Sequence, residues 1–369
     1  FRKKQIDFIT YKMRINFVVP EYTKTGGMRV VLLFAEELIG RGHDVSLYAP
    51  GVPFNPYRKQ FKPYFIKHRL RKSAGYLFGK EQADPFFAES RVKINTVPFI
   101  TDFFVPDADI VIATSWTSAY PVHRLPDRKG KKVYLVQDYE AWNSNVKYVD
   151  ESYKLPLYKI TVSEYLKKLL QEKFGEKSEK ILVSPDYRKF YNNDKRFEGP
   201  LRILFMDHVL PNKNVEGALA IVRRIKEKYP ETVFDCFGVD LFHEIPEFVR
   251  FHRNPSDEEI RRLYCDSGIF IFPSLYEGFG MPPAEAMACK CAVAGYASAA
   301  IPEYTENRVS ALLAQSGDSE GLFGCVEELM NDNELLRNIS MAGYENVKQK
   351  LNWEKSTDEF EIVLKGLVK

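Results

Sequence analysis

Two glutamates, Glu277 and Glu285, stand eight positions apart in the stretch PSLYEGFGMPPAEAMAC, which also holds two glycines and two prolines. The prolines are predicted to lie in the first turn of a helix, where a missing N–H costs nothing. The glycines before them let the backbone come close to a ligand, and a helix N-terminus favours an anion such as phosphate. Because carboxylates accept hydrogen bonds from hydroxyl groups, the stretch predicts a site for sugar or ribose hydroxyls beside a phosphate.

The two glutamates are expected on opposite sides of this site. Glu277 is predicted at the end of a strand, at the mouth of a cleft, and Glu285 in the first helical turn, facing back towards the same ligand. The alternative for Glu285 is a carboxylate that only complements the helix dipole, which is worth about 0.3–1 kcal/mol.

Short apolar runs alternate with helical patterns in the first half of the chain. Strands are predicted within Arg14–Pro20, Asp109–Thr114 and Lys132–Gln137, a helix over Glu164–Phe174, and Ile181–Ser184 closes the series. This alternation is typical of a parallel sheet with crossover helices.

The alternation restarts after a polar linker, Tyr191–Pro200. In the second series, Ser256 and Glu259 form the pattern of a capping box at the start of a helix. Two such series predict an α/β protein of two Rossmann-like parallel-sheet domains that face each other across a cleft. The expected domains are 1–192, joined by the C-terminal helix 353–369, and 199–350.

Composition agrees with a folded protein of more than one domain. The chain has 369 residues, of which 45% are hydrophobic, and its net charge of +3 does not by itself imply nucleic acid. Five cysteines form no CxxC pair and predict free thiols in a reducing compartment. No apolar run is long enough to span a bilayer and no signal peptide is recognised, so a cytoplasmic protein is expected.

The glutamate stretch also carries a resemblance to a known family. EGFGMPPAE fits the E-x7-E signature of retaining GT-B glycosyltransferases of glycosyltransferase family 4, and the chain resembles that family over nearly its full length. Supporting segments, in the family's order, are GGMRVVLLFAEELIGRGHDV, TVSEYLKKLLQEKFG, the elements around PNKNVEGAL, IPEYTENRVSALL and the helix after Trp353. VYLVQDYE and DIVIATSWTSAYPV look most like bacterial rhamnosyltransferases that assemble rhamnan or surface-layer glycans.

The resemblance implies a metal-independent, retaining transfer of a sugar from a nucleotide diphosphate donor to a bacterial surface glycan. It implies rhamnose from dTDP-rhamnose, a glycan acceptor that can be polyprenyl-linked, and no cofactor. Glu277 would contact the donor sugar and Glu285 the nucleotide ribose. The neighbouring turn would hold the donor through Gly278, Phe279, Gly280 and Met281.

The phosphate-binding pattern of the family is only partly present. In the family, the Arg and Lys of G-R-x4-K bind the diphosphate. In this chain the segment is DHVLPNK, so Asp207 and His208 occupy the first two positions and only Lys213 is kept. Lys213 is therefore the expected main cation. His208 either hydrogen-bonds a phosphate or is structural, and both readings stay open.

Further candidates come from other loops. Arg29, beside Gly26 and Gly27, is expected to compensate for the missing arginine, or else to be a solvated helix residue. Asp138 is expected to orient the acceptor, because the histidine of many relatives is replaced by the segment Ser-Trp-Thr at 115–117; its alternative is a loop-capping aspartate. The donor base would lie near Arg253 and Asn254. The predicted catalytic set is then Glu277, Lys213 and Asp138.

Three other patterns bear on metals and partners. Asp107 and Asp109 spell D-x-D but precede a strand, as a turn would, so no metal site is expected. The basic and aromatic stretch 57–80 predicts contact with an anionic membrane surface or, alternatively, a solvated loop. A nucleotide-sugar epimerase of the same fold stays an alternative. A non-catalytic nucleic-acid-binding protein would leave the glutamate stretch unexplained, so no nucleic acid is expected as a partner.

Overall fold

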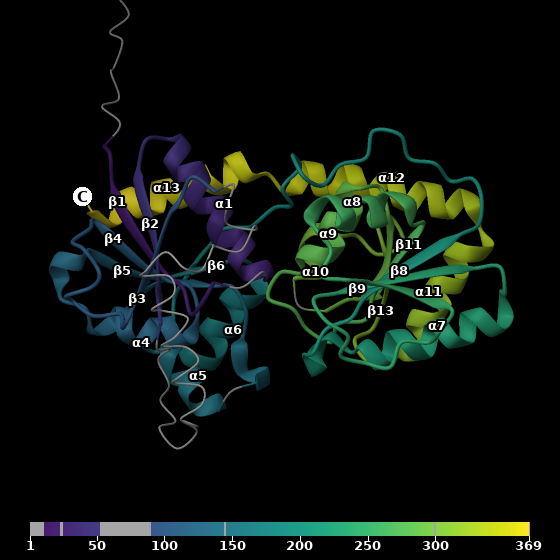
Figure 1. Cartoon of the computed structure of the whole chain (residues 1–369), viewed down its shortest axis with the longest axis horizontal. Helices are drawn as coiled ribbons and strands as arrows, with labels where there is room; N and C mark the ends of the chain where they lie inside the picture. Colours follow the sequence, from purple (N-terminus) through teal and green to yellow (C-terminus); the bar gives the residue numbers. More distant parts are fainter. Residues whose placement is uncertain (1–10, 23–24, 52–89, 144, 299, 369) are drawn as a thin grey trace, which may run out of the picture. The chain divides into compact units, whose positions relative to one another are not determined.

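The structure is a computed structural model that describes residues 11–22, 25–51, 90–143, 145–298 and 300–368. These residues form two compact α/β units (Figure 1). The first holds the described residues up to Leu135, Asp150–Ile160 and those from Thr357 onward, and the second holds the rest. The predicted linker Tyr191–Pro200 lies inside the second unit by this division, and the predicted domain boundaries stay a prediction.

The first sheet has seven strands in the order β3-β2-β1-β4-β5-β6-β7. From β3 to β5 its neighbours pair in parallel, with Ile15 opposite both Val45 and Ile110. Its strands are β1 (Arg14–Val18), β2 (Asp44–Pro50), β3 (Lys93–Val97), β4 (Ile110–Ala113), β5 (Lys131–Val136), β6 (Tyr158–Thr161) and β7 (Glu179–Lys180). The last strand therefore ends before Ile181–Ser184, the segment expected to close this series.

Helices alternate with strands in the first half, and α6 matches the predicted helix Glu164–Phe174. Thr25 caps the N-terminus of α1 by accepting a hydrogen bond from the Met28 N–H at 3.3 Å, and Ser163 caps α6 in the same way. The helices are α1 (Gly26–Gly40), α4 (Trp116–Arg124), α5 (Val146–Tyr153) and α6 (Glu164–Phe174), with short 3-10 turns η2 (Asp127–Lys129) and η3 (Glu140–Asn143).

The second sheet has six strands, all parallel, in the order β10-β9-β8-β11-β12-β13. Its strands are β8 (Arg202–Met206), β9 (Val233–Gly238), β10 (Val249–Arg253), β11 (Ile269–Phe272), β12 (Ala292–Tyr296) and β13 (Leu312–Ala314). In each sheet the order reverses beside the first strand, as in the doubly wound Rossmann arrangement. The prediction of two Rossmann-like parallel sheets is confirmed.

Helices cover both faces of the second sheet, with α7 and α11 on one face and α8 and α9 on the other (Figure 1). The helical elements are η4 (Pro211–Lys213), α7 (Val215–Lys228), α8 (Asp257–Asp266), α9 (Met281–Ala288), α10 (Ile301–Tyr304), α11 (Ser319–Asn331), α12 (Asn333–Lys350) and α13 (Trp353–Val368). The capping box predicted at α8 is confirmed, since Ser256 Oγ accepts the Glu259 N–H and the Glu259 carboxylate accepts the Ser256 N–H.

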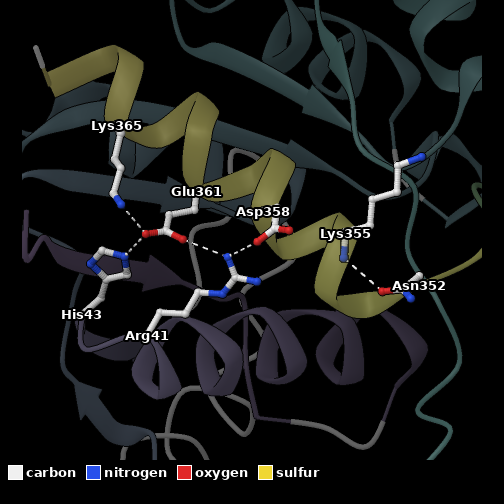
Figure 2. A network of polar contacts seen from close by, with 7 residues as sticks. All are labelled: Arg41, His43, Asn352, Lys355, Asp358, Glu361 and Lys365. Carbon is white, nitrogen blue, oxygen red and sulfur yellow. Dashed lines mark hydrogen bonds and ion pairs between the residues drawn. The ribbon is translucent and has the colours of Figure 1, made fainter. Parts of the chain in front are cut away.

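A polar network joins the C-terminal helix to the α1–β2 turn (Figure 2). The Glu361 carboxylate accepts hydrogen bonds from Arg41 at 2.9 Å, from His43 Nε2 at 2.9 Å and from Lys365 at 2.5 Å. His43 Nδ1 accepts the Met13 N–H, so Nε2 carries the ring proton of the neutral imidazole. Arg41 also contacts Asp358.

These bonds have a clear effect on the Glu361 carboxyl group. Burial alone would raise its pKa, but the hydrogen bonds from Lys365, Arg41 and His43 lower the pKa to about 2. Nearby, the Phe360 ring stacks on Phe34 with ring centroids 4.4 Å apart. We call this set of five residues, Arg41, His43, Asp358, Glu361 and Lys365, the α13 clasp.

Candidate functional site

The candidate site lies where the strand order of the second sheet reverses, between β8 and β11. In open α/β sheets, loops that leave the carboxyl ends of strands at such a point diverge and leave room for a ligand. The loop after β8 carries Lys213, in η4, and the loop after β11 carries Glu277. The two residues, which come from separate sequence motifs, thus lie at the same edge of the second sheet.

Lys213 and Glu277 form a buried ion pair. Lys213 Nζ lies 2.5 Å from Glu277 Oε1, and their side chains are only 14% and 8% exposed. Removing two charges from water is costly, and such a pair is often no more stable than an apolar substitute. The pair is therefore weak evidence for a stabilising role of Lys213.

Both loops are fixed by side-chain amides that flank the lysine. Asn212 Nδ2 donates to the Tyr276 carbonyl at 3.2 Å, and Asn214 Nδ2 donates to the Pro273 carbonyl at 3.3 Å. In return, the Asn212 carbonyl accepts the Leu275 N–H at 2.8 Å. The asparagines of PNKN thus hold the lysine loop against the glutamate loop, and both were missed in the sequence although they flank Lys213.

The glycine turn needs its glycines. Gly280 has a φ of +87°, and a Cβ there would lie 2.5 Å from Ile301 Cδ1. A Cβ on Gly278 would lie 1.9 Å from the Gln137 carbonyl oxygen, so the backbones approach too closely for any side chain. The predicted close approach of these glycines to a ligand stays a prediction; in the structure they approach the Gln137 backbone and the Ile301 side chain.

Tyr304 locks the turn from the side. Its hydroxyl donates to the Gly280 carbonyl at 2.8 Å, and its ring stacks on Phe279 with centroids 5.1 Å apart. Burial raises the pKa of the Tyr304 phenol well above its ordinary value, which keeps the hydroxyl protonated as a donor. The sequence carries no signal for this contact, because the acceptor is a backbone carbonyl.

Helix α9 starts directly after the turn, with Gly280 as its N-cap and Met281 as its first residue. The predicted helix is confirmed, but the expected place of Glu285 in its first turn is wrong: Glu285 is the fifth helical residue, and no acidic residue lies in the first turn. The helix begins before Pro282 because the left-handed conformation of Gly280 already turns the chain. Glu285 is buried, with 5% of its surface exposed.

His208 is held neutral beside the ion pair. Its Nδ1 accepts the Leu210 N–H at 3.1 Å, so the ring proton lies on Nε2. Burial, followed by the positive charge of Lys213, lowers the pKa of His208 to about 4. The imidazole is therefore a neutral hydrogen-bond donor near neutral pH, which leaves both its structural and its phosphate-binding interpretation open.

Asp207 does not add a free carboxylate next to the lysine. Its oxygens accept hydrogen bonds from His243 Nδ1 at 2.6 Å and from the Phe242 N–H at 2.8 Å, and the residue is 1% exposed. The departure from the family's G-R pattern thus supplies an anchor for the loop after β9.

The predicted acceptor residue Asp138 caps its own loop in part, because its Oδ1 accepts the Tyr139 N–H at 2.8 Å. The same carboxylate acts on Tyr276, whose pKa is raised to about 12 by burial first and by Asp138 next. The role of Asp138 towards an acceptor stays a prediction.

Other candidates lie on separate elements. Arg253 and Asn254, at the end of β10, are exposed; Arg253 pairs with Asp240 at 3.4 Å, and Asn254 adopts a φ of +46°. Gly26, Gly27 and Arg29 form the first turn of α1, in the first unit. Their predicted contacts with a donor stay predictions. The stretch 57–80 lies outside the described residues.

The D-x-D aspartates have structural partners. Asp107 pairs with Lys129 at 2.8 Å, and the Asp109 carboxylate accepts the Arg14 N–H at 2.7 Å. Among the described residues, no cluster of three or more His, Cys, Asp or Glu side chains is placed to hold a metal ion. Within the same residues, no helix has the length and apolar character needed to cross a membrane.

The part of the chain that contains this site is similar to a known protein family. Residues 187–346, which contain every element from β8 to α11, match the family model described as Glycosyl transferases group 1. The matched region, a little under half of the chain, is thus similar to this family. It contains Lys213, Glu277 and the glycine turn.

Individual relatives are more distant. O-antigen chain mannosyltransferase B of Escherichia coli is 25% identical over 168 residues, covering 42% of this chain and 43% of the relative. An uncharacterised glycosyltransferase of Methanocaldococcus jannaschii is 26% identical over 205 residues, covering 53% of this chain and 56% of the relative. The chain thus matches about half the length of these curated relatives.

Solved structures extend the likeness to both units. The structure of Anabaena Alr3699/HepE in complex with UDP-glucose superposes with a TM-score of 0.74 at 14% identity, covering 96% of this chain and 100% of that one. At this identity the likeness shows the fold, and it confirms the predicted GT-B class of two Rossmann-like domains.

Proposed function

We propose that the protein is a glycosyltransferase that moves a sugar from a nucleoside diphosphate donor to a glycan acceptor. The observation that carries the proposal is the buried pair of Lys213 and Glu277 at the strand reversal, beside a glycine turn that opens α9. The group 1 domain match covers this site. Relatives named as glycosyltransferases support it and disfavour the epimerase alternative.

In the proposed reaction, Lys213 neutralises charge that develops on the diphosphate as the bond between the anomeric carbon and the phosphate oxygen breaks. The backbone amides at the start of α9 face the same charge. Glu277 accepts hydrogen bonds from sugar hydroxyls and so positions the sugar, and Glu285 holds the ribose. In this scheme Lys213 and the amides of α9 stabilise the diphosphate without a metal ion.

We propose that configuration is retained. The acceptor hydroxyl bonds to the anomeric carbon on the face that the phosphate leaves, and its proton passes to a leaving phosphate oxygen. No separate enzymic base is then needed. This scheme suits a site in which His208 is a neutral hydrogen-bond donor whose Nδ1 lone pair is already occupied by the Leu210 N–H.

Rhamnose from dTDP-rhamnose is our first proposal for the donor, on the resemblance of VYLVQDYE and DIVIATSWTSAYPV to rhamnosyltransferases. Mannose is the second candidate, because a curated relative is named as a mannosyltransferase of O-antigen chains. We propose a bacterial surface glycan as acceptor, polyprenyl-linked and reached at a membrane surface through 57–80.

Calorimetric titration with dTDP, UDP and GDP, each with EDTA present, tests the proposal. We expect one nucleotide to bind clearly more tightly than the others without metal, dTDP for a rhamnose donor and GDP for a mannose donor. Release of the same nucleoside diphosphate from its sugar conjugate, in step with a glycosidic product, then separates transfer from epimerisation. Failure of all three nucleotides to bind would contradict the donor site.

A further inference from the structure

The short helix α10 contacts two functional elements at once. It contains Glu303 and Tyr304, which are adjacent in sequence, and it follows β12 at the carboxyl edge of the second sheet. Tyr304 holds the glycine turn through the Gly280 carbonyl and the Phe279 ring. Glu303 makes a different set of contacts.

Glu303 binds the N-terminus of α6. Its Oε2 accepts the Glu164 N–H at 2.8 Å, and its Oε1 accepts the Tyr165 N–H at 3.0 Å. Ser163 Oγ accepts the next N–H, that of Leu166, at 3.2 Å. The first four N–H groups of a helix lack partners within it, and negative charge is favoured there. A single carboxylate, 138 residues further along the chain than Tyr165, thus satisfies two of them.

Helix α10 is itself held firmly between these contacts. Asn346, on α12, donates from Nδ2 to the Tyr304 carbonyl, and Thr305 Oγ1 donates to the Ile301 carbonyl at 2.7 Å. Ile301 and Tyr304 are both fully buried, with 0% of their surface exposed. Glu303 and Tyr304 are the last two residues of this four-residue helix, so their contacts share one short, well-packed element.

We propose that Glu303 is a positioning residue for the donor site: by anchoring α10 to the first turn of α6, it sets the position from which Tyr304 holds the glycine turn. The inference rests on the proposed function, because the turn is taken to bind the donor diphosphate. Glu303 contacts the amides of α6 and acts on the turn only through Tyr304.

The arrangement gives a reason for the carboxylate. An amide in its place would keep one acceptor oxygen but turn an NH₂ group towards the second helical N–H, so α6 would lose one bond and its charge complement. The turn would then lose its fixed support although no residue of the turn had changed. By reciprocity, a ligand that fixes the turn also steadies the first turn of α6.

The test measures nucleotide affinity and amide exchange in the full chain. The variants are Glu303→Gln, Tyr304→Phe and the double variant, with Glu306→Gln as matched control, because Glu306 is an exposed acid just beyond α10. Each is titrated with the nucleoside diphosphate that wild type binds best among dTDP, UDP and GDP. Hydrogen exchange is followed in peptides covering α6, with and without that nucleotide, and melting temperatures verify folding.

We expect Tyr304→Phe to raise the nucleotide Kd about tenfold, through loss of a buried hydrogen bond. Glu303→Gln should raise it about 3- to 10-fold. The Kd of the double variant should rise by less than the product of the two single increases, because both changes act through α10. Nucleotide should slow exchange at the start of α6 in wild type and in Glu306→Gln, but not in Glu303→Gln.

An unchanged nucleotide Kd in a folded Glu303→Gln variant would overturn the inference, even if its melting temperature fell, since a merely structural cap changes stability alone. The inference would also be overturned if hydrogen exchange in α6 of the wild type were the same with and without bound nucleotide. Both results leave the proposed function standing. If wild type binds none of the three nucleotides, the proposed function fails, and this inference fails with it.

Discussion

The ammonium group of Lys213 donates a 2.5 Å hydrogen bond to the carboxylate of Glu277, 64 residues later in the chain. The two residues lie in the loops that follow neighbouring strands, β8 and β11, at the place in the second sheet where the strand order reverses. Without ligand, each charge is balanced by the other. In the proposed function, a bound diphosphate would pair with the ammonium of Lys213. The Glu277 carboxylate would then be available to accept hydrogen bonds from the hydroxyl groups of the sugar.

Replacing Lys213 by alanine should lower turnover by about 10²–10³, as for loss of a preorganised group that stabilises developing charge. The rate of nucleoside diphosphate release from the preferred donor measures this. Lys228→Ala is the matched control, because that lysine forms an exposed pair with Glu327 on the surface, and it should keep wild-type turnover. Near-normal turnover of Lys213→Ala would remove the lysine from the mechanism.

Glu277→Gln should separate binding from turnover. The change leaves the ammonium of Lys213 without its balancing charge, so the free nucleoside diphosphate should bind as tightly as to wild type or more tightly. Turnover should still fall by at least about 10²-fold, because the carboxylate no longer positions the sugar. Calorimetry and donor turnover measure the two effects; full activity, or weakened nucleotide binding, would contradict the assigned role.

His208 should make stability depend on pH. Its pKa is lowered to about 4, mainly by burial, whereas an unfolded chain has a histidine pKa near 6.5. Between these values the unfolded state binds the extra proton, so stability falls as pH drops from about 6.5 to 4, by up to about 3 kcal/mol. His208→Asn retains an acceptor for the Leu210 N–H and should lose this part of the decline.

Urea unfolding of wild type and His208→Asn at pH 7 and at pH 4.5 measures the difference. The loss of stability between the two pH values should be smaller in the variant by up to about 2–3 kcal/mol. Equal losses in both proteins would show that His208 is not the group concerned.

Gly278→Ala should disrupt the candidate site although it adds only one methyl group. Its Cβ would lie 1.9 Å from the Gln137 carbonyl oxygen, so the backbone must shift. We expect a loss of stability of at least about 1–3 kcal/mol and weakened nucleotide binding. At Gly324, an exposed residue of α11, an added Cβ meets nothing within 4 Å, so Gly324→Ala should stabilise the protein by up to about 1 kcal/mol. Thermal unfolding compares the two; equal effects would contradict the close contact.

Local patterns in the sequence predicted most of the fold, because they depend on near neighbours. The capping box of Ser256 and Glu259 spans three residues, and the apolar spacing of Glu164–Phe174 matches α6 residue for residue. The prediction at Ile181–Ser184 was less accurate, since a short apolar run alone does not show whether a strand continues. The conformation of Gly280 likewise decided where α9 begins, and with it the place of Glu285.

The candidate site was predictable only where chemistry is visible in residue type. Glu277 was predicted from its spacing to Glu285 and Lys213 from the family's phosphate-binding pattern, whereas Tyr304 was missed because it binds a backbone carbonyl. Asp207 was noted as a departure from the family pattern, and its hydrogen bonds to the loop after β9 could not be read from the sequence. Such contacts join distant parts of the chain, and no local pattern encodes them.

The α13 clasp also bears on how the chain is made. His43 and Glu361 are separated by 318 residues, so the first unit can close its clasp only after the second unit has left the ribosome. At about 5–20 residues per second, that delay is on the order of tens of seconds. During synthesis the face of α1 around Phe34 lacks its contact with Phe360. For that time we expect this face of the nascent chain to be accessible to chaperones or to incorrect partners.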